Sequence, residues 1–390
     1  NLLIFLKKMD LILFNTLMNL QLKKINKKMA KKIKLFDPVV DEEDQKAVDK
    51  VLKSHFWASG TGTGNVFQFE EKFRKYVGAK DCVAVNSGTA ALHLAVLLSD
   101  VKNKEVIIPS LSFTSTAHAV LYNGGKPIFV DVDPQTLCLD PNMIKKSITK
   151  KTKAILPVHF GGLAANIDEI DSLCKEHNIT LIEDAAHAAG TSYKNKKIGT
   201  HGNLVCFSFH PVKNLAMPTG GAILLNDKNS RKQKEILKSL RWCGISNRKD
   251  TTYDISHLGW NYYMNEFSAA IGISQLKKLD KQNKKRQDIA QKYSKNIQDL
   301  TKMPFDKECS YHFYWIQVKN RNKFMKKMTE YGIETGIHYK PIHEMTFYKN
   351  STKLPITEQV GKQIVSLPIH PNLTDNDVNK IIKLTNQFSC

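Results

Sequence analysis

One lysine, Lys213, stands where a side chain could act as a nucleophile. It follows residues 204–209, an apolar segment with the length and the β-branched and aromatic composition of a strand. Pro211 ends that segment, and a Gly220-Gly221 turn precedes a second apolar segment at 222–225. Burial between two strands lowers the pKa of a lysine and leaves a nucleophilic amine suited to a Schiff base. The alternative is a solvated surface lysine, which is the commoner state of this residue.

A carboxylate follows another expected strand, at residues 179–182. This strand runs into Glu183-Asp184-Ala-Ala-His187. In open α/β sheets, ligands bind at the carboxyl ends of strands, so Asp184 is placed to meet a ligand. A carboxylate there can hold a protonated ring nitrogen. Taken alone, the segment is equally compatible with a helix-capping aspartate beside a hydrogen-bonded histidine.

A third strand end carries a turn that suits an anion. The expected strand 82–86 is followed by Ser87-Gly88-Thr89 and then by an Ala/Leu-rich helix over 90–98. Such a turn directs backbone N–H groups and a hydroxyl at the helix start, where the helix dipole favours negative charge. An ordinary helix cap by Ser87 is the alternative.

The elements that must position these residues alternate between strand and helix. Near-continuous apolar strands in such an alternation predict an α/β fold with a mostly parallel sheet covered by helices on both faces. Further strands are expected at 105–108, 127–131 and 153–158, and helices at 41–52, 166–177, after Asp227 to about Gly244, and from Glu266 to about Ile297.

The C-terminal part predicts a smaller α+β domain. Residues 311–318 and 364–367 are strand-like, and 322–331 are helical. We therefore expect a large domain over 29–285 and a small domain over 286–390, joined by the long Lys-rich helix.

The composition limits the partners of the protein. The formal charge of +21 comes largely from lysines on solvated helix faces, and no nucleic-acid-binding motif is visible. A basic surface helps to attract an anionic, phosphate-bearing substrate. The seven scattered cysteines include no CxxC pair, which predicts reduced thiols in a cytoplasmic protein without a metal site.

Residues 1–28 differ from the remainder of the chain. Lys7, Lys8 and Asp10 interrupt the apolar run too early for a membrane-spanning helix, and no small-residue cleavage site indicates a signal peptide. We expect an extension outside the fold, with a natural start at Met29. Amphipathic membrane attachment is the alternative.

Six motifs occur in the order seen in DegT-type nucleotide-sugar aminotransferases, which the chain resembles from Phe36 onward. These proteins are pyridoxal phosphate (PLP) enzymes of the aspartate-aminotransferase fold, fold type I. Six ordered motifs are far more specific than any one of them. The motifs are Ser87-Gly-Thr-Ala-Ala-Leu, Pro109-Ser-Leu-Ser-Phe113, Glu183-Asp-Ala-Ala-His187, Phe207-Ser-Phe-His-Pro-Val-Lys213-Asn, Gly259-Trp-Asn-Tyr262 and Ile337-His-Tyr-Lys-Pro-Ile-His343.

The resemblance implies roles for individual residues. Lys213 would be the Schiff-base lysine and proton shuttle, and Asp184 would pair with the pyridine nitrogen. Phe113 would stack on the ring, and His187 would lie near its hydroxyl edge. The phosphate would be held by Gly88, Thr89 and Ser208, joined by Asn261 from the partner subunit of a homodimer with shared active sites. Tyr339 and His343 resemble residues of the substrate end.

The chain departs from the family pattern after the lysine, where Pro218-Thr219 stands in place of the usual Gly-Glu. This change bears on the choice of sugar, whereas the lysine itself is present. The implied function is transfer of an amino group from an amino acid, glutamate by expectation, to a keto group of a nucleotide-linked deoxysugar. A PLP enzyme acting on an amino acid and a non-catalytic regulatory relative are the alternatives. Retention of both Lys213 and Asp184 argues against the second.

Overall fold

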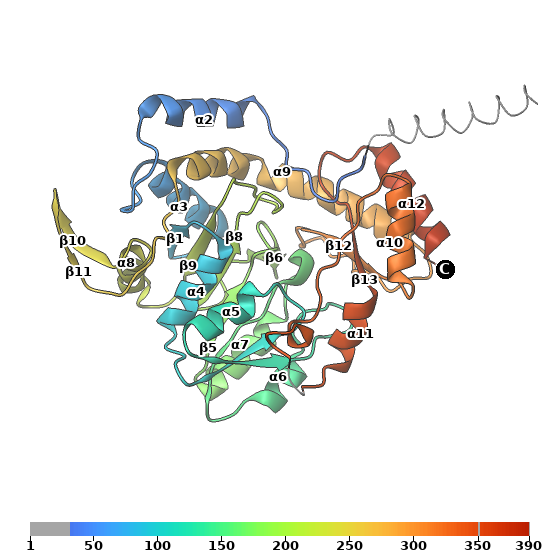
Figure 1. Cartoon of the computed structure of the whole chain (residues 1–390), viewed down its shortest axis with the longest axis horizontal. Helices are drawn as coiled ribbons and strands as arrows, with labels where there is room; N and C mark the ends of the chain where they lie inside the picture. Colours follow the sequence, from blue (N-terminus) through green and yellow to red (C-terminus); the bar gives the residue numbers. More distant parts are fainter. Residues whose placement is uncertain (1–31, 350–351, 390) are drawn as a thin grey trace, which may run out of the picture.

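The structure, a computed structural model, describes residues 32–349 and 352–389. The expected extension at 1–28 lies outside the described residues. A seven-stranded sheet forms the centre of the molecule, and a smaller C-terminal part lies beside it (Figure 1). Among the described residues, no helix is both long and apolar enough to cross a membrane.

The central sheet has the strand order β1-β9-β8-β5-β4-β2-β3. Strands β2, β3, β4, β5 and β8 pair in parallel, while β9 runs antiparallel to both β1 and β8. The prediction of a mostly parallel sheet is therefore confirmed. The strands are β1 (Asp81–Val85), β2 (Glu105–Pro109), β3 (Lys126–Val130), β4 (Thr152–Ile155), β5 (Thr180–Asp184), β8 (Leu204–Ser208) and β9 (Gly221–Leu225).

Successive side chains of each strand enter two different hydrophobic cores. In β8, Leu204 and Cys206 face one core, whereas Val205 and Phe207 face the other. This alternation follows from the period of two in a strand, and it explains why the strands are apolar on both faces. Every residue of β9 is buried for the same reason.

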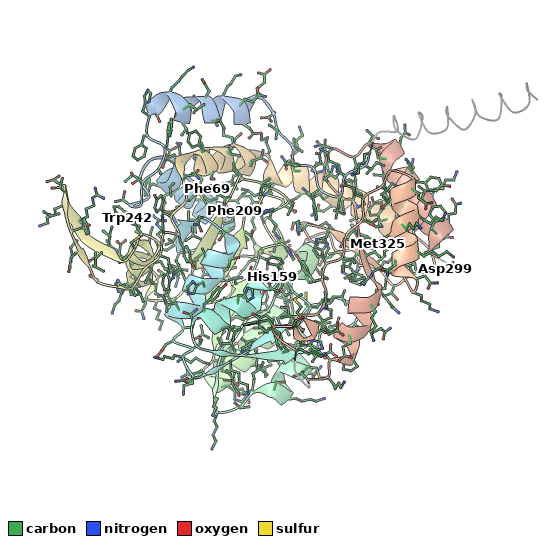
Figure 2. The ribbon with its side chains drawn as sticks, in the orientation of Figure 1. Phe69, His159, Phe209, Trp242, Asp299 and Met325 are labelled. Carbon is green, nitrogen blue, oxygen red and sulfur yellow. The ribbon has the colours of Figure 1, made fainter. Side chains whose placement is uncertain are left out.

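Helices cover both faces of the sheet. The first core contains side chains of α3 (Gly64–Val77), α6 (Pro141–Ser147), α7 (Ile167–His177) and α9 (Glu266–Asn296). The second contains those of α4 (Gly88–Leu98), α5 (Ser115–Tyr122) and α8 (Ser230–Leu240). In the first core, the ring of Phe69 on α3 meets Phe209 edge-on, with centroids 5.3 Å apart (Figure 2).

The long helix α9 runs from the central sheet toward the C-terminal part (Figure 1). Its first half packs beside α3 and α2 (Glu42–Ser54). The C-terminal part contains an antiparallel pair of strands with three helices, an α+β arrangement as expected. These elements are β12 (Tyr314–Gln317), β13 (Ile364–Leu367), α10 (Arg321–Glu330), α11 (Pro355–Gln363) and α12 (Asp375–Phe388). The domain boundary at residue 286 falls inside α9 and stays a prediction.

Several elements were not predicted. The hairpin of β10 (Ile245–Lys249) and β11 (Thr252–Ile255) projects from the body beside α8 (Figure 1). Most of its residues are exposed, so the sequence shows no alternation of buried and exposed positions there. Helix α3 was also missed, although its buried Val66, Phe69, Phe73 and Val77 have helical spacing. Also missed were the short helix α6, the helices α11 and α12, and the short strands β6 (Ser192–Tyr193) and β7 (Lys196–Lys197).

Candidate active site

A cavity of about 320 Å³ lies where the carboxyl ends of β5 and β8 meet the turn after β1. It is the place where the sequence predicted a ligand. Eight of the ten predicted site residues line it, and they come from both the large and the small part of the chain. They are Gly88, Thr89, Phe113, Asp184, His187, Ser208, Lys213 and Tyr339.

Lys213 lies in the connection between β8 and β9, and its side chain reaches into the cavity. The backbone N–H of Lys213 donates to the carbonyl of His210 at 2.8 Å, which tightens the turn after Pro211. Burial lowers the pKa of the Lys213 amine to about 8, while the charge of Asp184 acts in the opposite direction. A lysine with this pKa is partly neutral at physiological pH and is a competent nucleophile.

Asp184 ends β5 and is 4% exposed. One carboxylate oxygen accepts from the hydroxyl of Thr116 at 2.9 Å, and the other accepts from the backbone N–H of Ala186 at 3.1 Å. Burial is the largest influence on its pKa and raises it, whereas the hydrogen bonds from Ala186 and Thr116 and the charge of Lys213 act in the opposite direction. A cationic ring nitrogen would add a further counter-charge to this buried carboxylate, so the site suits a protonated pyridine.

The turn after β1 forms a close-fitting cradle at the start of α4. The hydroxyl of Ser87 accepts from Ala90 N–H at 3.1 Å, so Ser87 does cap the helix, as the alternative interpretation held. Gly88 and Thr89, the first residues of the helix, line the cavity. A Cβ on Gly88 would lie 2.7 Å from Cβ of Ser208, and a Cβ on Gly221 would lie 2.3 Å from the Ser87 carbonyl oxygen.

Rings border the remaining sides of the cavity. Phe113 is 58% exposed, so its ring is free to stack on a planar ligand. His187 Nε2 lies 3.0 Å from the hydroxyl of Tyr339, which comes from the small part of the chain. Burial holds the pKa of His187 well below its usual value, so this imidazole is neutral. Its buried Nδ1 has no hydrogen-bond partner among the described residues.

Two predicted site residues lie outside the cavity. His343 is buried against Ser110, with Nδ1 2.7 Å from its hydroxyl, because the turn Ile342–Glu344 packs on the end of β2; its assignment to the substrate end stays a prediction. Asn261 is exposed and does not line the cavity of its own chain. Its carbonyl accepts from the side-chain amide of Asn86 at 3.2 Å, next to the cradle.

The structure adds residues that sequence reasoning missed. Thr116 holds Asp184, and His338 lines the cavity with Nδ1 2.8 Å from the Ser366 hydroxyl. His312 lies behind the cavity, with Nε2 3.4 Å from Nζ of Lys213. His338 lay inside the polar cluster next to Tyr339, which was a usable signal. His312 sits inside an apolar segment and gave none.

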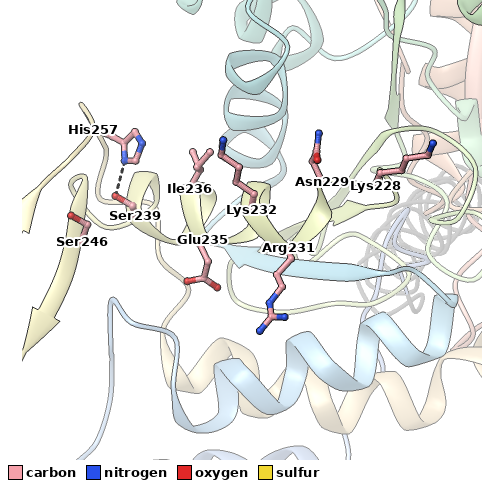
Figure 3. A pocket seen from close by; sticks show the side chains of 9 residues that line it. All are labelled: Lys228, Asn229, Arg231, Lys232, Glu235, Ile236, Ser239, Ser246 and His257. Carbon is pink, nitrogen blue, oxygen red and sulfur yellow. Dashed lines mark hydrogen bonds between the residues drawn. The ribbon is translucent and has the colours of Figure 1, made fainter.

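A larger surface hollow, of about 600 Å³, lies between α8 and the β10–β11 hairpin. Figure 3 shows Ser239 hydrogen-bonded to His257 at one end, at 3.1 Å. The side chains of Arg231 and Glu235 point away from those of Lys228 and Lys232 (Figure 3). The charged groups therefore do not converge on a ligand, and the cavity at Lys213 is the better candidate site.

The fold and the cavity together define the class of protein. A lysine between two strands, a buried carboxylate with neutral donors and a side-chain-free cradle at a helix start all fit PLP. Lys213 would bond to the cofactor, Asp184 would hold its ring nitrogen, and Gly88, Thr89 and Ser208 would surround its phosphate. This is the arrangement of a PLP-dependent enzyme of the α/β class.

Comparison with known proteins identifies the family. The model of the DegT/DnrJ/EryC1/StrS aminotransferase family matches residues 38–385, and the chain belongs to this family. The spore coat polysaccharide biosynthesis protein SpsC of Bacillus subtilis is 33% identical over 369 residues, which cover 89% of this chain and 94% of the relative. An uncharacterized protein of Methanocaldococcus jannaschii, MJ1066, is 34% identical over 369 residues, covering 89% of this chain and 95% of the relative.

Solved structures agree with this assignment. PseC of Helicobacter pylori, an aminotransferase involved in the biosynthesis of pseudoaminic acid, is 29% identical and has a TM-score of 0.86, covering 92% of this chain and 99% of its own. Spr1654 of Streptococcus pneumoniae in its PLP form is 25% identical, with a TM-score of 0.86 and the same coverage of 92% and 99%. The protein is a PLP-dependent aminotransferase.

Proposed function

We propose that the protein transfers an amino group from an amino acid, glutamate in the simplest case, to a keto group of a nucleotide-linked deoxysugar. The product would enter the synthesis of a cell-surface polysaccharide, another glycan or an antibiotic sugar. The observation that carries the proposal is the cavity in which Lys213, Asp184 and the Gly88 cradle converge in a chain of this family.

Lys213 and Asp184 would have different roles in the reaction. PLP, when bound, supplies the electron sink that makes a carbon–hydrogen bond beside nitrogen acidic. Lys213 is placed to take a proton at Nζ and to return it, because its lowered pKa makes both directions accessible near neutral pH. Asp184, fixed by Thr116 and Ala186, keeps negative charge at the cavity floor.

Rings and helix-start N–H groups line different parts of the cavity wall. The Phe113 and Tyr339 rings lie on one side with centroids 6.1 Å apart, and the Gly88 and Thr89 N–H groups lie at the helix start. Thr219, which replaces the glutamate of relatives, lines the cavity, and its hydroxyl donates to the carbonyl of Asn86. A neutral, already bonded group therefore stands where an acidic one is usual, and we infer a sugar preference different from that of glutamate-bearing relatives.

The proposal includes a homodimer in the cytoplasm. Asn261 is exposed beside the cradle of its own chain, so a symmetric partner can present it to the neighbouring cradle. This supports shared active sites with Asn261 of each subunit near the phosphate of the other. Light scattering of the purified protein tests the dimer. Mixing inactive Lys213→Ala and Asn261→Ala subunits tests the sharing, because a mixed dimer would regain one intact site.

A direct assay tests the reaction. The purified protein with PLP is offered a panel of nucleotide-linked 3-keto and 4-keto deoxysugars, with glutamate, glutamine, aspartate or alanine as donors, and amino sugars are detected by mass spectrometry. We expect at least one keto-sugar to be aminated by wild type and none by Lys213→Ala. Turnover of amino acids alone, with every sugar inert, would favour the alternative of an amino-acid enzyme.

A further inference from the structure

Four rings form a column that begins at the cavity wall with Tyr339 and His187 and continues behind it. The Phe36 ring stacks on His312 with centroids 5.2 Å apart and an interplanar angle of 17°. His312 in turn stacks on His187 at 4.7 Å and 27°, and His187 on Tyr339 at 6.1 Å and 19°. His312 is 1% exposed, and its backbone N–H donates to the carbonyl of Gly161 at 2.8 Å. Both faces and the backbone of His312 are therefore fixed.

The edge of this fixed ring points at the reactive lysine. His312 Nε2 lies 3.4 Å from Lys213 Nζ, and the buried Nδ1 has no partner among the described residues. Burial and the nearby charge of Lys213 hold the pKa of His312 well below its usual value, so the imidazole is neutral. With its proton on Nδ1, the ring offers the lone pair of Nε2 to Lys213. Other titratable groups surround the pair and contribute to its electrostatics, namely Asp184, His187, His210, His338 and, on the side of His312, Arg286.

A catalytic lysine of this kind must also be held in position while it is not bonded to the cofactor. During each turnover its amine is released and must stay in place to move a proton and to bond again. A flexible four-carbon side chain does not hold one position without a partner. If one N–H of the amine is directed to Nε2 of His312, the lone pair of the amine points away from His312, toward the cavity.

We propose that His312 is a positioning residue that accepts a hydrogen bond from the free ε-amino group of Lys213 and fixes it for proton transfer. The proposal rests on the aminotransferase function and goes beyond it, because it concerns the enzyme when Lys213 is not bonded to cofactor. His312 acts through Lys213 and needs no contact with the sugar or the amino acid.

The first test follows the amine itself in the full chain freed of cofactor. Lysines are acetylated briefly with acetic anhydride across a series of pH values, and the Lys213 peptide is quantified by mass spectrometry. His312→Phe keeps an aromatic ring in the column and removes the acceptor. An acceptor stabilises the ammonium form, so we expect this variant to lower the labelling pKa of Lys213 by about one unit. With cofactor and substrates, kcat falls about tenfold or more and KM changes little.

Two matched variants separate the hydrogen bond from the packing. His312→Gln places an amide oxygen near the position of Nε2, and it should return the labelling pKa of Lys213 toward the wild-type value. Phe36→Leu removes one face of the column and leaves the acceptor, so the labelling pKa should stay within about 0.3 unit of wild type. An unchanged labelling pKa in His312→Phe, or equal shifts in His312→Phe and Phe36→Leu, would overturn the proposal.

A second measurement needs no change at His312. Deuterium exchange at the ring C2 position, followed by mass spectrometry, reports the pKa of individual histidines. Lys213→Ala removes the charge that disfavours protonation of His312, so the pKa of His312 should rise. An unchanged pKa of His312 in Lys213→Ala would refute the pairing.

Both measurements are made without substrate. A shift in the labelling pKa of Lys213 with no keto-sugar aminated would therefore reject the substrate proposal and leave the role of His312 standing.

Discussion

Gly88 and Ser208 approach so closely that a Cβ on Gly88 would lie 2.7 Å from Cβ of Ser208. The two residues come from different strand ends, one from the turn after β1 and the other from the end of β8. The absence of a side chain on Gly88 brings the helix start of α4 against β8. The cradle proposed for the cofactor phosphate depends on this contact.

Gly88→Ala should therefore weaken PLP binding more than it weakens the fold. The added methyl group meets Ser208 at less than van der Waals distance and pushes the N–H groups of α4 away from the cradle. We expect PLP affinity to fall about 100-fold, with a change of only about 1–3 kcal/mol in the free energy of unfolding of the cofactor-free chain. Cofactor absorbance titrations and urea unfolding measure the two quantities.

Ser208→Gly removes the Cβ that the new methyl group would meet. In the double variant with Gly88→Ala, part of the lost affinity should return relative to the sum of the single changes. Strict additivity of the two substitutions would show that the weakening does not arise from this contact.

The lowered pKa of Lys213 predicts how stability responds to pH. The folded-state pKa of about 8 lies below the ordinary value of 10.5, so between these pH values the unfolded chain binds more protons at this position. The contribution of Lys213 to stability is complete above 10.5 and is lost as the pH falls through about 8. Compared with Lys213→Met, the cofactor-free wild type should gain stability as the pH rises from about 7 to about 10.

Urea unfolding of both proteins at several pH values measures this difference. Lys292→Met is a suitable control, because Lys292 is a half-exposed lysine paired with Asp375. The difference in stability between wild type and Lys292→Met should change far less between about pH 7 and about pH 10. A constant difference between wild type and Lys213→Met would mean that the amine of Lys213 titrates as an ordinary lysine.

A second buried carboxylate ties the two parts of the chain together. Asp131, just after β3, accepts from the N–H and the hydroxyl of Thr357 at 2.8 and 2.7 Å and from the N–H of Ile356 at 3.0 Å, all at the start of α11. Asp131→Ala leaves these buried donors without an acceptor, so we expect the free energy of unfolding to fall by about 2–4 kcal/mol. Thr357→Val, which removes one donor, should cost about 1 kcal/mol. Equal small losses in both variants would contradict this account of Asp131.

The residues expected to contact the cofactor were easier to predict from the sequence than the residues that hold them in place. Lys213, Asp184 and the Ser87-Gly88-Thr89 turn follow strands whose apolar runs are unmistakable, and parallel strands bring their carboxyl ends to one edge. Residues that act through a neighbour leave no such pattern. His312 is a buried polar residue within a segment that otherwise indicates only a core, and Thr116 is one of several serines and threonines that no spacing singles out.

The position of His343 was not predictable from the sequence for a related reason. Tyr339 and His343 are four residues apart in one polar cluster, but a sequence does not show on which side of a turn each side chain lies. The turn at Ile342–Glu344 directs His343 to Ser110, away from the cavity. The exposed hairpin β10–β11 was missed for a different reason, because strands without a buried face carry no alternating pattern.

The role of Asp184 can be separated from a purely structural one by Asp184→Asn. The substitution preserves the shape of the side chain and its ability to accept from Thr116 or Ala186, but it removes the negative charge. A carboxylate at the ring nitrogen keeps that nitrogen protonated, and only the protonated ring withdraws electrons strongly. We expect the variant to fold and to bind PLP, and to lose transamination by a factor of about 1,000 or more, which corresponds to about 4 kcal/mol in the activation barrier.

The loss should appear in both half-reactions, since both require the same electron withdrawal. Rapid mixing of the PLP-loaded variant with glutamate alone, followed by absorbance, isolates the first half, and the keto-sugar with the amine form of the cofactor isolates the second. Thr116→Val is the matched control: it removes one hydrogen bond to Asp184 and retains the charge, so its loss should be far smaller, about tenfold. Near-normal rates in Asp184→Asn would show that another group protonates the ring, and Asp184 would then be a structural residue.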